Sequence, residues 1–320
     1  MPDKKKLAIG IDFGGTSVKF GVVTPHGKIV KKLVLETNAE KGPKHVIKQI
    51  IKGVKELQKE SRYKFTGIGI GSPGIISIKK GTVENPPNIP GWGKVHLGSI
   101  IEKETGIETF VENDANTAAL GELIFGSGKA FNSFIMVTLG TGVGGGLILN
   151  KKLYRGETGG AGEIGHVSIN INGKKCNCGS VGCIEAYTGN NYLVEDVREL
   201  LGMNKDSKIY EILENDLDLL TPEIISMAAE TGDEFSINVI NEIGRNLGCA
   251  LASVSNVLDV TTIIIGGGVA GFGKRLFESI SSSARERVLK SLSPRIKVIP
   301  AKLKNDAGIK GASALVFYKK

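Results

Sequence analysis

What this sequence lacks excludes two classes of protein. The longest apolar run, residues 261–267, is far too short to span a bilayer, so we expect no membrane partner. Residues 1–6 lead into a short apolar stretch without a small-residue cleavage site, so we expect no signal peptide and a cytoplasmic location. Aromatic residues are scarce at 6%, whereas there are 44 glycines. This composition favours an α/β protein with many tight turns.

The charge is one-sided but dispersed. The formal net charge is +8, yet the lysines are scattered along the chain and are not interleaved with aromatic residues. The densest basic stretch, residues 41–64, carries apolar residues at helical spacing, which predicts a helix with one buried face and one solvated basic face. We prefer that interpretation to a DNA-binding surface and expect no nucleic-acid partner. The positive charge would still concentrate anionic substrates such as ATP.

Cysteine is rare and unevenly distributed. Three of the four cysteines lie within eight residues, and in a reducing compartment such a cluster indicates a metal before a disulfide. With the preceding histidine they make a complete tetrahedral set, which predicts a structural Zn²⁺ site: His166, Cys176, Cys178 and Cys183. Unliganded thiols, or a metal site that differs in detail, are the alternatives. Cys249 lies alone in an apolar run and is interpreted as a small buried side chain.

One structural plan occurs twice along the chain. Each copy begins with short apolar strands around a glycine-rich turn, near the N-terminus and again from residue 134. Placing Asp12 over Thr138 also aligns Gly14 with Gly140, an offset of 126 residues. Two such β-meanders, each followed by helices, predict a duplicated α/β domain with a cleft between the halves.

Periodicity and turn signals place the remaining elements. We expect strands at residues 7–12, 18–23, 29–35, 67–71, 109–112, 134–138, 144–149 and 260–265. We expect helices at residues 43–60, 191–201, 222–231, 233–256 and 305–318, and a further one that opens at Asn113-Asp114. We predict a small lobe at residues 1–117, on which the C-terminal helix (303–320) packs, and a large lobe with the zinc loop at residues 118–302.

Three glycine-rich turns suit a phosphate ligand. Glycine lets backbone N–H groups approach an oxyanion without an intervening Cβ, and threonine adds a hydroxyl donor. The turns are Asp12-Phe13-Gly14-Gly15-Thr16, Thr138-Leu139-Gly140-Thr141-Gly142 and Gly266-Gly267-Gly268. Asp12 is placed to hold Mg²⁺ through water, and the third turn to admit an adenine ring. Plain hairpin or strand-to-helix turns are the alternatives, and a dinucleotide motif is disfavoured because the second turn continues as a strand.

A carboxylate follows the strand expected at residues 109–112. Ligands of α/β folds bind at such strand ends, and phosphoryl transfer to a hydroxyl needs a carboxylate that accepts the proton. Asp114 is the natural candidate, and a helix N-cap role for the same residue is the alternative. Glu163 and Glu185 flank the predicted zinc site and suit recognition of vicinal sugar hydroxyls, unless they are solvated loop charges.

These segments together carry a family resemblance that spans nearly the whole chain. The motifs are the Asp12 turn, Glu112-Asn113-Asp114-Ala115-Asn116, the run at 139–146, Glu163-Ile164-Gly165-His166 and the cysteine segment at 176–185. In this order they resemble the ROK family (repressors, open reading frames and sugar kinases), most closely its bacterial ATP-dependent glucokinases. The resemblance implies an actin-like, hexokinase-type fold, with sugar and ATP between two lobes, and a homodimer or homotetramer. Asp259 is a minor departure, because relatives often have proline before this strand.

The resemblance also implies roles for single residues. Asp114 is the implied general base, and His166 is shared between sugar and zinc through its two ring nitrogens. The implied sugar-binding set is Gly74, Asn88, Asn113, Asp114, Glu163, His166 and Glu185. The implied ATP-binding set is Asp12, Gly14, Gly15, Thr16, Lys19, Thr138, Gly140, Thr141, Gly142, Gly266, Gly267 and Gly268. The implied reaction transfers the γ-phosphate of ATP to the 6-hydroxyl of glucose, with Mg²⁺ and a structural Zn²⁺.

Other functions within the family stay open. Related kinases act on mannose, N-acetylglucosamine, N-acetylmannosamine or fructose, and some use polyphosphate as the donor, although the polyphosphate users tend to lack the cysteine cluster. Sugar-responsive repressors carry a helix-turn-helix module ahead of the kinase-like part. Only 11 residues precede Asp12, so we expect no DNA-binding module here.

Overall fold

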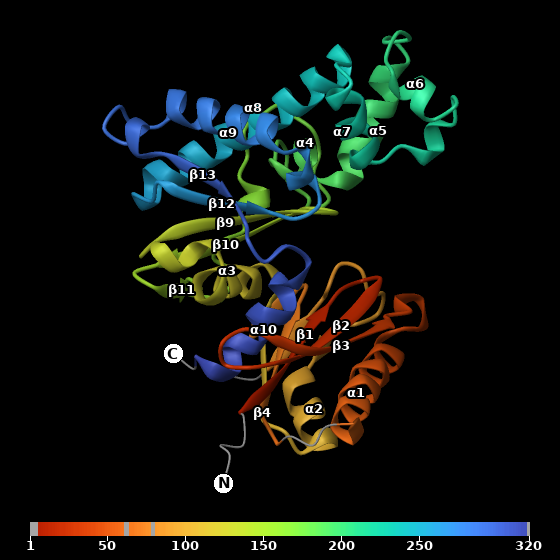
Figure 1. The fold of residues 1–320 in the computed structure, drawn as a ribbon, viewed down its shortest axis with the longest axis vertical. Helices are drawn as coiled ribbons and strands as arrows, with labels where there is room; N and C mark the ends of the chain where they lie inside the picture. Colours follow the sequence, from red (N-terminus) through yellow and green to blue (C-terminus); the bar gives the residue numbers. More distant parts are fainter. Residues whose placement is uncertain (1–5, 61–63, 78–80, 319–320) are drawn as a thin grey trace. The chain divides into compact units, whose positions relative to one another are not determined.

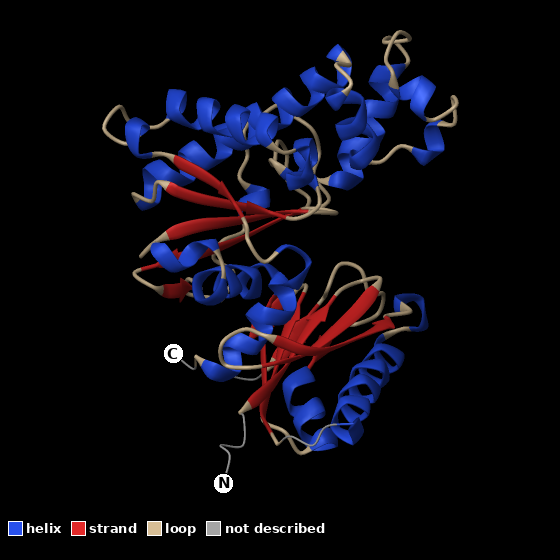
Figure 2. Ribbon diagram, in the orientation of Figure 1, coloured by secondary structure: helices blue, strands red, loops and turns tan. Residues whose placement is uncertain are grey.

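The computed structural model describes residues 6–60, 64–77 and 81–318 (Figures 1 and 2). Most of the N-terminal segment considered as a signal peptide, and residues 319–320 of the expected C-terminal helix, lie outside the described residues. Contacts divide the chain into two compact units. The first contains Met1–Asn132, Gly146–Gly162 and Lys302–Lys320, and the second contains Ser133–Gly145 and Glu163–Ala301.

The first unit is built on a five-stranded sheet with the order β3-β2-β1-β4-β8. Its strands are β1 (Leu7–Phe13), β2 (Ser17–Val23), β3 (Ile29–Glu36), β4 (Phe65–Ser72) and β8 (Thr109–Asn113). The first three form the predicted antiparallel meander, and β4 and β8 run parallel to β1. The carboxyl ends of the parallel strands therefore meet at one edge, where Asp12, Gly71 and Glu112 are in register.

A second five-stranded sheet repeats this plan with the order β11-β10-β9-β12-β13. Its strands are β9 (Phe134–Leu139), β10 (Val143–Leu149), β11 (Lys152–Tyr154), β12 (Thr262–Gly266) and β13 (Lys297–Pro300). Strands β9, β12 and β13 are parallel, and β10 and β11 are antiparallel. Strand β10 begins and ends 126 residues after β2, the offset found in the sequence. The predicted duplication is confirmed.

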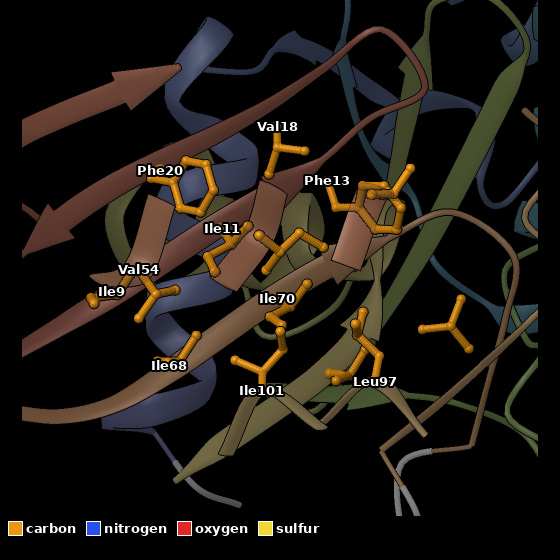
Figure 3. Packing of buried hydrophobic residues seen from close by; sticks show 14 of the residues in the cluster. Ile9, Ile11, Phe13, Val18, Phe20, Val54, Ile68, Ile70, Leu97 and Ile101 are labelled. Carbon is orange, nitrogen blue, oxygen red and sulfur yellow. The ribbon is translucent and has the colours of Figure 1, made fainter. Parts of the chain in front are cut away.

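Helices cover both faces of the first sheet (Figure 1). α1 (Pro43–Glu60) and α2 (Leu97–Thr105) lie on one face, and α10 (Ala307–Phe317) lies on the other. The first turns of α3 (Asp114–Phe125) also reach that second face, because a Cβ at Gly71 of β4 would come 2.5 Å from the Thr117 hydroxyl. The core forms on the α1 and α2 face, because branched apolar residues occupy alternate positions of the strands. Figure 3 shows Ile9, Ile11, Phe13, Val18, Phe20, Ile68 and Ile70 packed with Val54, Leu97 and Ile101.

The opposite face of this sheet is lined by glycine. Every second residue of β4 from Gly67 to Gly71 is a glycine, and these glycines face α3 and α10. A Cβ at Gly69 would overlap the carbonyl of Ala312, and a Cβ at Gly10 would overlap that of Ile309. The C-terminal helix α10 therefore lies against bare backbone, closer than side chains would allow.

The second unit is mostly helical outside β9, β12, β13 and the start of β10. Its helices are α4 (Glu185–Thr188), α5 (Asn190–Leu201), α6 (Ile209–Ile212), α7 (Pro222–Glu230), α8 (Glu234–Leu258) and α9 (Lys274–Arg287). Thr221 caps α7 and Asp233 caps α8 through side-chain hydrogen bonds, in line with the predicted helix starts. Cys249 lies in α8 and is half-buried rather than buried as predicted. No helix among the described residues is long and apolar enough to cross a membrane.

Several elements, most of them short, were not predicted. A three-stranded sheet comprises β5 (Ile75–Ser77), β6 (Thr82–Glu84) and β7 (Lys94–Val95), and helix α9 and strand β13 are also additions. Strands of two or three residues are too short to show a period, so no pattern marks them. The 3₁₀ turns are Ala39–Lys41, Ser127–Ala130, Ile164–His166, Leu217–Leu219, Val269–Phe272, Ser293–Arg295 and Lys304–Asp306.

Candidate active site

The first glycine-rich turn joins β1 to β2. The Gly14 N–H donates to Ser17 O across the turn (3.0 Å), and the Thr37 hydroxyl donates to Gly14 O (2.7 Å). The Asp12 carboxylate lies 3.7 Å from the ammonium group of Lys19, its partner in register on β2. Gly15 and the exposed Thr16 complete the turn. A carboxylate and an ammonium beside a glycine-rich backbone suit a metal-bound phosphate.

Asp12 is held in a largely buried position. Only 26% of its side chain is exposed, and the first turn of α10 lies against it, because a Cβ at Gly308 would come within 2.8 Å of both carboxylate oxygens. Burial raises the pKa of Asp12 above its ordinary value, and Lys19 lowers it in part. A buried carboxylate with a perturbed pKa at the end of a strand is a feature of functional sites.

Two residues implied in sugar binding lie in the same unit as this turn. Asn88 lies against the turn, because a Cβ at Gly15 would come 2.7 Å from the Asn88 Cβ. Gly74 follows β4 with a φ of 91°, and a Cβ there would come 2.6 Å from Glu84 O. A side chain at residue 74 would therefore be strained as well as crowded, so only glycine suits this corner.

The turn from β8 into α3 presents Asp114. The Asn113 side chain accepts hydrogen bonds from the N–H groups of Ala115 (3.0 Å) and Asn116 (3.2 Å), so Asn113 is the N-cap. The alternative in which Asp114 caps the helix is therefore wrong. Asp114 is the first helical residue, is exposed, and accepts the Ala115 N–H at 2.7 Å.

The second glycine-rich turn, residues 138–142, joins β9 to β10. Gly140 N–H donates to Gly142 O (2.9 Å), and the start of α5 holds the turn from outside. There Asn190 N–H donates to Gly140 O (3.0 Å) and Asn191 N–H donates to Thr141 O (3.2 Å). The chain continues as strand β10, so the dinucleotide motif disfavoured from sequence is excluded. No Cβ added at Gly140 would meet a described atom within 4 Å, which leaves room for a ligand.

The third turn lies beside the second. Gly266 ends β12, and Gly267 has a φ of 91°. A Cβ at Gly267 would overlap the backbone of Leu139, so β12 and β9 end in close contact. Nothing among the described residues lies within 4 Å of a Cβ added at Gly268. Gly267 is thus explained by packing, and Gly268 keeps the open space that an adenine ring would need.

The predicted zinc ligands converge in the second unit. Ligand atoms of His166, Cys176, Cys178 and Cys183 all lie within 4.8 Å of one another. The Sγ atoms of Cys178 and Cys183 are 3.7 Å apart, and His166 Nδ1 is 3.8 Å from Cys176 Sγ. Two sulfurs bound tetrahedrally at the usual Zn–S length are about 3.8 Å apart, so the residues fit a zinc ion.

The thiol environment agrees with a metal site. Burial raises the pKa of Cys183 to about 12, burial also raises that of Cys176, and a backbone hydrogen bond from Ser180 lowers that of Cys178. Without a cation, the Cys176 and Cys183 sulfurs would therefore stay protonated at neutral pH. A bound Zn²⁺ supplies the charge that displaces these protons.

The zinc loop carries the remaining implied sugar ligands. His166 turns Nε2 toward Glu163, whose Oε2 is 3.9 Å away, while Nδ1 faces the sulfurs. Glu185, the first residue of α4, accepts the Val143 N–H through Oε2 (2.9 Å), and Oε1 lies 3.9 Å from Cys176 Sγ. Glu185 therefore connects the metal cluster to the second glycine-rich turn.

The sequence-predicted residues form two sets, one in each unit. Asp12, Asn88 and Asp114 belong to the first unit, with Gly74, Asn113 and the rest of the first turn. Glu163, His166 and Glu185 belong to the second, with the cysteines and the other two turns.

Comparison with known proteins establishes the family. Residues 8–319 match the sequence model of the ROK family. The chain belongs to the ROK family. It is 35% identical to a glucokinase of Thermotoga maritima, with 98% of each chain covered. A ROK family glucokinase from Streptomyces griseus, solved in complex with glucose and AMPPNP, has a TM-score of 0.85 at 33% identity, with 97% of this chain and 98% of that one covered.

The same family also contains regulators. A xylose repressor of Bacillus subtilis is 30% identical over 98% of this chain and 77% of its own length. The two duplicated lobes have the actin-like fold of ROK glucokinases, as the sequence implies.

Removal of one zinc ligand tests the metal site. Cys178→Ser should reduce bound zinc from about one ion per chain to a small fraction and lower the melting temperature, because metal binding contributes directly to folding. Metal analysis and thermal unfolding measure both effects. Cys249→Ser is the matched control and should change neither. A purified wild-type chain that holds no zinc under metal-replete conditions would contradict the site.

Neutralising Asp12 tests the stability cost of its burial. Because its folded pKa is raised, Asp12 favours folding in its protonated form below its unfolded value of 3.8, and that contribution is lost as pH rises through the raised pKa. Asp12→Asn should therefore raise the melting temperature by a few degrees at pH 7, and the gain should vanish toward pH 4. Asp306→Asn, at a carboxylate paired with Lys32, should give no gain. An Asp12→Asn chain less stable than wild type at pH 7 would refute the assignment.

Proposed function

We propose that this protein is an ATP-dependent hexose kinase, and that glucose is its leading acceptor. The observation that carries the proposal is the full-length similarity to a ROK glucokinase crystallised with glucose and AMPPNP. The motif residues support it, because each lies in a setting that suits its implied role. Asp114 stands at a strand-to-helix corner, the Glu163 carboxylate lies 3.9 Å from Nε2 of the zinc-cluster histidine, and the second and third glycine-rich turns end the adjacent strands β9 and β12.

In the proposed reaction, Asp114 accepts the proton of the sugar 6-hydroxyl as the bond to the γ-phosphorus forms. The Asn113 side-chain oxygen is committed to the cap, so its amide nitrogen is the group that donates to the sugar. Glu163, Glu185 and His166 Nε2 recognise sugar hydroxyls. The glycine-rich turns hold the phosphates, and Mg²⁺, held through water at Asp12, would neutralise their charge.

A coupled assay tests donor and acceptor together. Purified protein should phosphorylate glucose with ATP faster than mannose, fructose, N-acetylglucosamine or N-acetylmannosamine, and faster than with polyphosphate as the donor. A preference for a different sugar would change the assigned substrate but would still support the assignment as a kinase. Sugar binding without phosphoryl transfer from either donor would refute the kinase and favour a regulator, as in the xylose repressors.

Substitution of Asp114 tests the general base. Asp114→Ala should lower kcat by about 10²-fold or more, while the sugar dissociation constant changes little. Because Asn113 is the cap, the melting temperature should be nearly unchanged. Asn113→Ala is the matched variant and should destabilise the fold by about 1 kcal/mol through loss of the cap. Normal turnover in Asp114→Ala would remove this residue from the mechanism.

A further inference from the structure

One buried carboxylate adjoins the proposed base and takes no part in the proposed reaction. The side chain of Glu112, at the end of β8, is only 2% exposed. Its Oε1 accepts the Asn113 N–H (3.0 Å) and the Asn116 side-chain amide (3.1 Å). Its Oε2 accepts Arg155 Nε at 2.7 Å. Glu112 therefore holds the residues immediately before and shortly after Asp114.

Asn116 is fixed in turn by its surroundings. It is 2% exposed, and its Oδ1 is buried without a hydrogen-bond partner among the described residues. That oxygen would lie 3.4 Å from a Cβ at Gly146, so β10 closes off its other side. The bond from Asn116 to Glu112 is thus the polar contact that sets the Asn116 side chain, one helical turn from the Asn113 cap.

Arg155 approaches the same corner from another part of the chain. Arg155 follows β11. Its ion pair with Glu112 is largely shielded from solvent, because 29% of the Arg155 side chain and 2% of the Glu112 side chain are exposed. Its carbonyl accepts the Ala161 N–H (3.1 Å), which closes a loop containing the left-handed glycines Gly156 and Gly159. This loop leads to Gly162, the last residue before the chain enters the second unit at Glu163.

We propose that Arg155 and Glu112 are a positioning pair for the kinase reaction. The ion pair sets the backbone direction at Asn113 and so aims the Asp114 side chain, and the same arginine fixes the base of the loop that leads to Glu163. This inference rests on the proposed kinase function. Neither residue touches the reacting atoms. A buried pair of this kind contributes little net stability, whereas removal of one partner leaves the other charge uncompensated.

The test separates positioning from stability. Arg155→Met and Glu112→Gln should each lower kcat by about 10- to 100-fold, as expected for a small misplacement of the base, with the sugar KM changed less than about threefold. Arg155→Lys keeps the charge and should recover part of the kcat. In the double variant the loss should be well below the product of the single losses, because both changes disrupt one interaction.

Arg198→Met is the matched control, since Arg198 is a partly exposed arginine of the second unit that also faces a carboxylate. It should leave kcat unchanged. All variants are assayed well below their melting temperatures, with zinc content as a check of folding. A wild-type kcat in Arg155→Met, whether or not its melting temperature falls, would reduce the pair to a structural contact. No phosphoryl transfer by the wild-type chain on any sugar would instead overturn the kinase proposal, and this inference with it.

Discussion

The corner at which β8 turns into α3 is the constraint on which the first unit's candidate site depends. A strand that becomes a helix leaves backbone N–H groups without partners, and each needs an acceptor. Here the Asn113 side chain accepts the Ala115 N–H, and the buried Glu112 accepts the Asn113 N–H. These two hydrogen bonds fix the backbone on either side of one residue and so orient its side chain. That residue is Asp114. Because Asn113 caps the helix, the Asp114 carboxylate can take part in a reaction without loss of the cap.

The second unit achieves order by a different means. Its candidate ligands lie on loops, a 3₁₀ turn and the first residue of the short helix α4. The four-residue cluster brings these loops together, two of its cysteines also pack in a small hydrophobic cluster with Ala186, and Glu185 contacts the second glycine-rich turn through the Val143 N–H. In the proposed enzyme, a sugar hydroxyl that donates to the Glu185 carboxylate would therefore also affect the position of the phosphate-binding turn, because Glu185 accepts the Val143 N–H.

Features encoded by neighbouring residues could be predicted from the sequence, whereas contacts between distant residues could not. The glycine-rich turns, the zinc set and the start of α3 are each encoded by residues close together in the sequence, and all were predicted. The pairing of Arg155 with Glu112 joins residues 43 apart, and the fully buried Glu122 accepts the N–H of Leu303, 181 residues away. No spacing in one sequence marks such pairs. The β5–β7 sheet was missed for another reason, since its strands are shorter than one readable period.

Duplication of a fold does not require duplication of its chemistry. Both sheets share one strand order, and in each a glycine with a φ of 91° follows the strand next to the meander, Gly74 after β4 and Gly267 after β12. The equivalent corner residues differ, however, because the first turn carries Asp12 where the second carries Thr138. A carboxylate suits a hydrated cation, whereas a hydroxyl suits a phosphate oxygen directly. The raised pKa of Asp12 shows that burial at this corner disfavours the ionised carboxylate. The second half has the neutral Thr138 at the equivalent position and therefore buries no charge there.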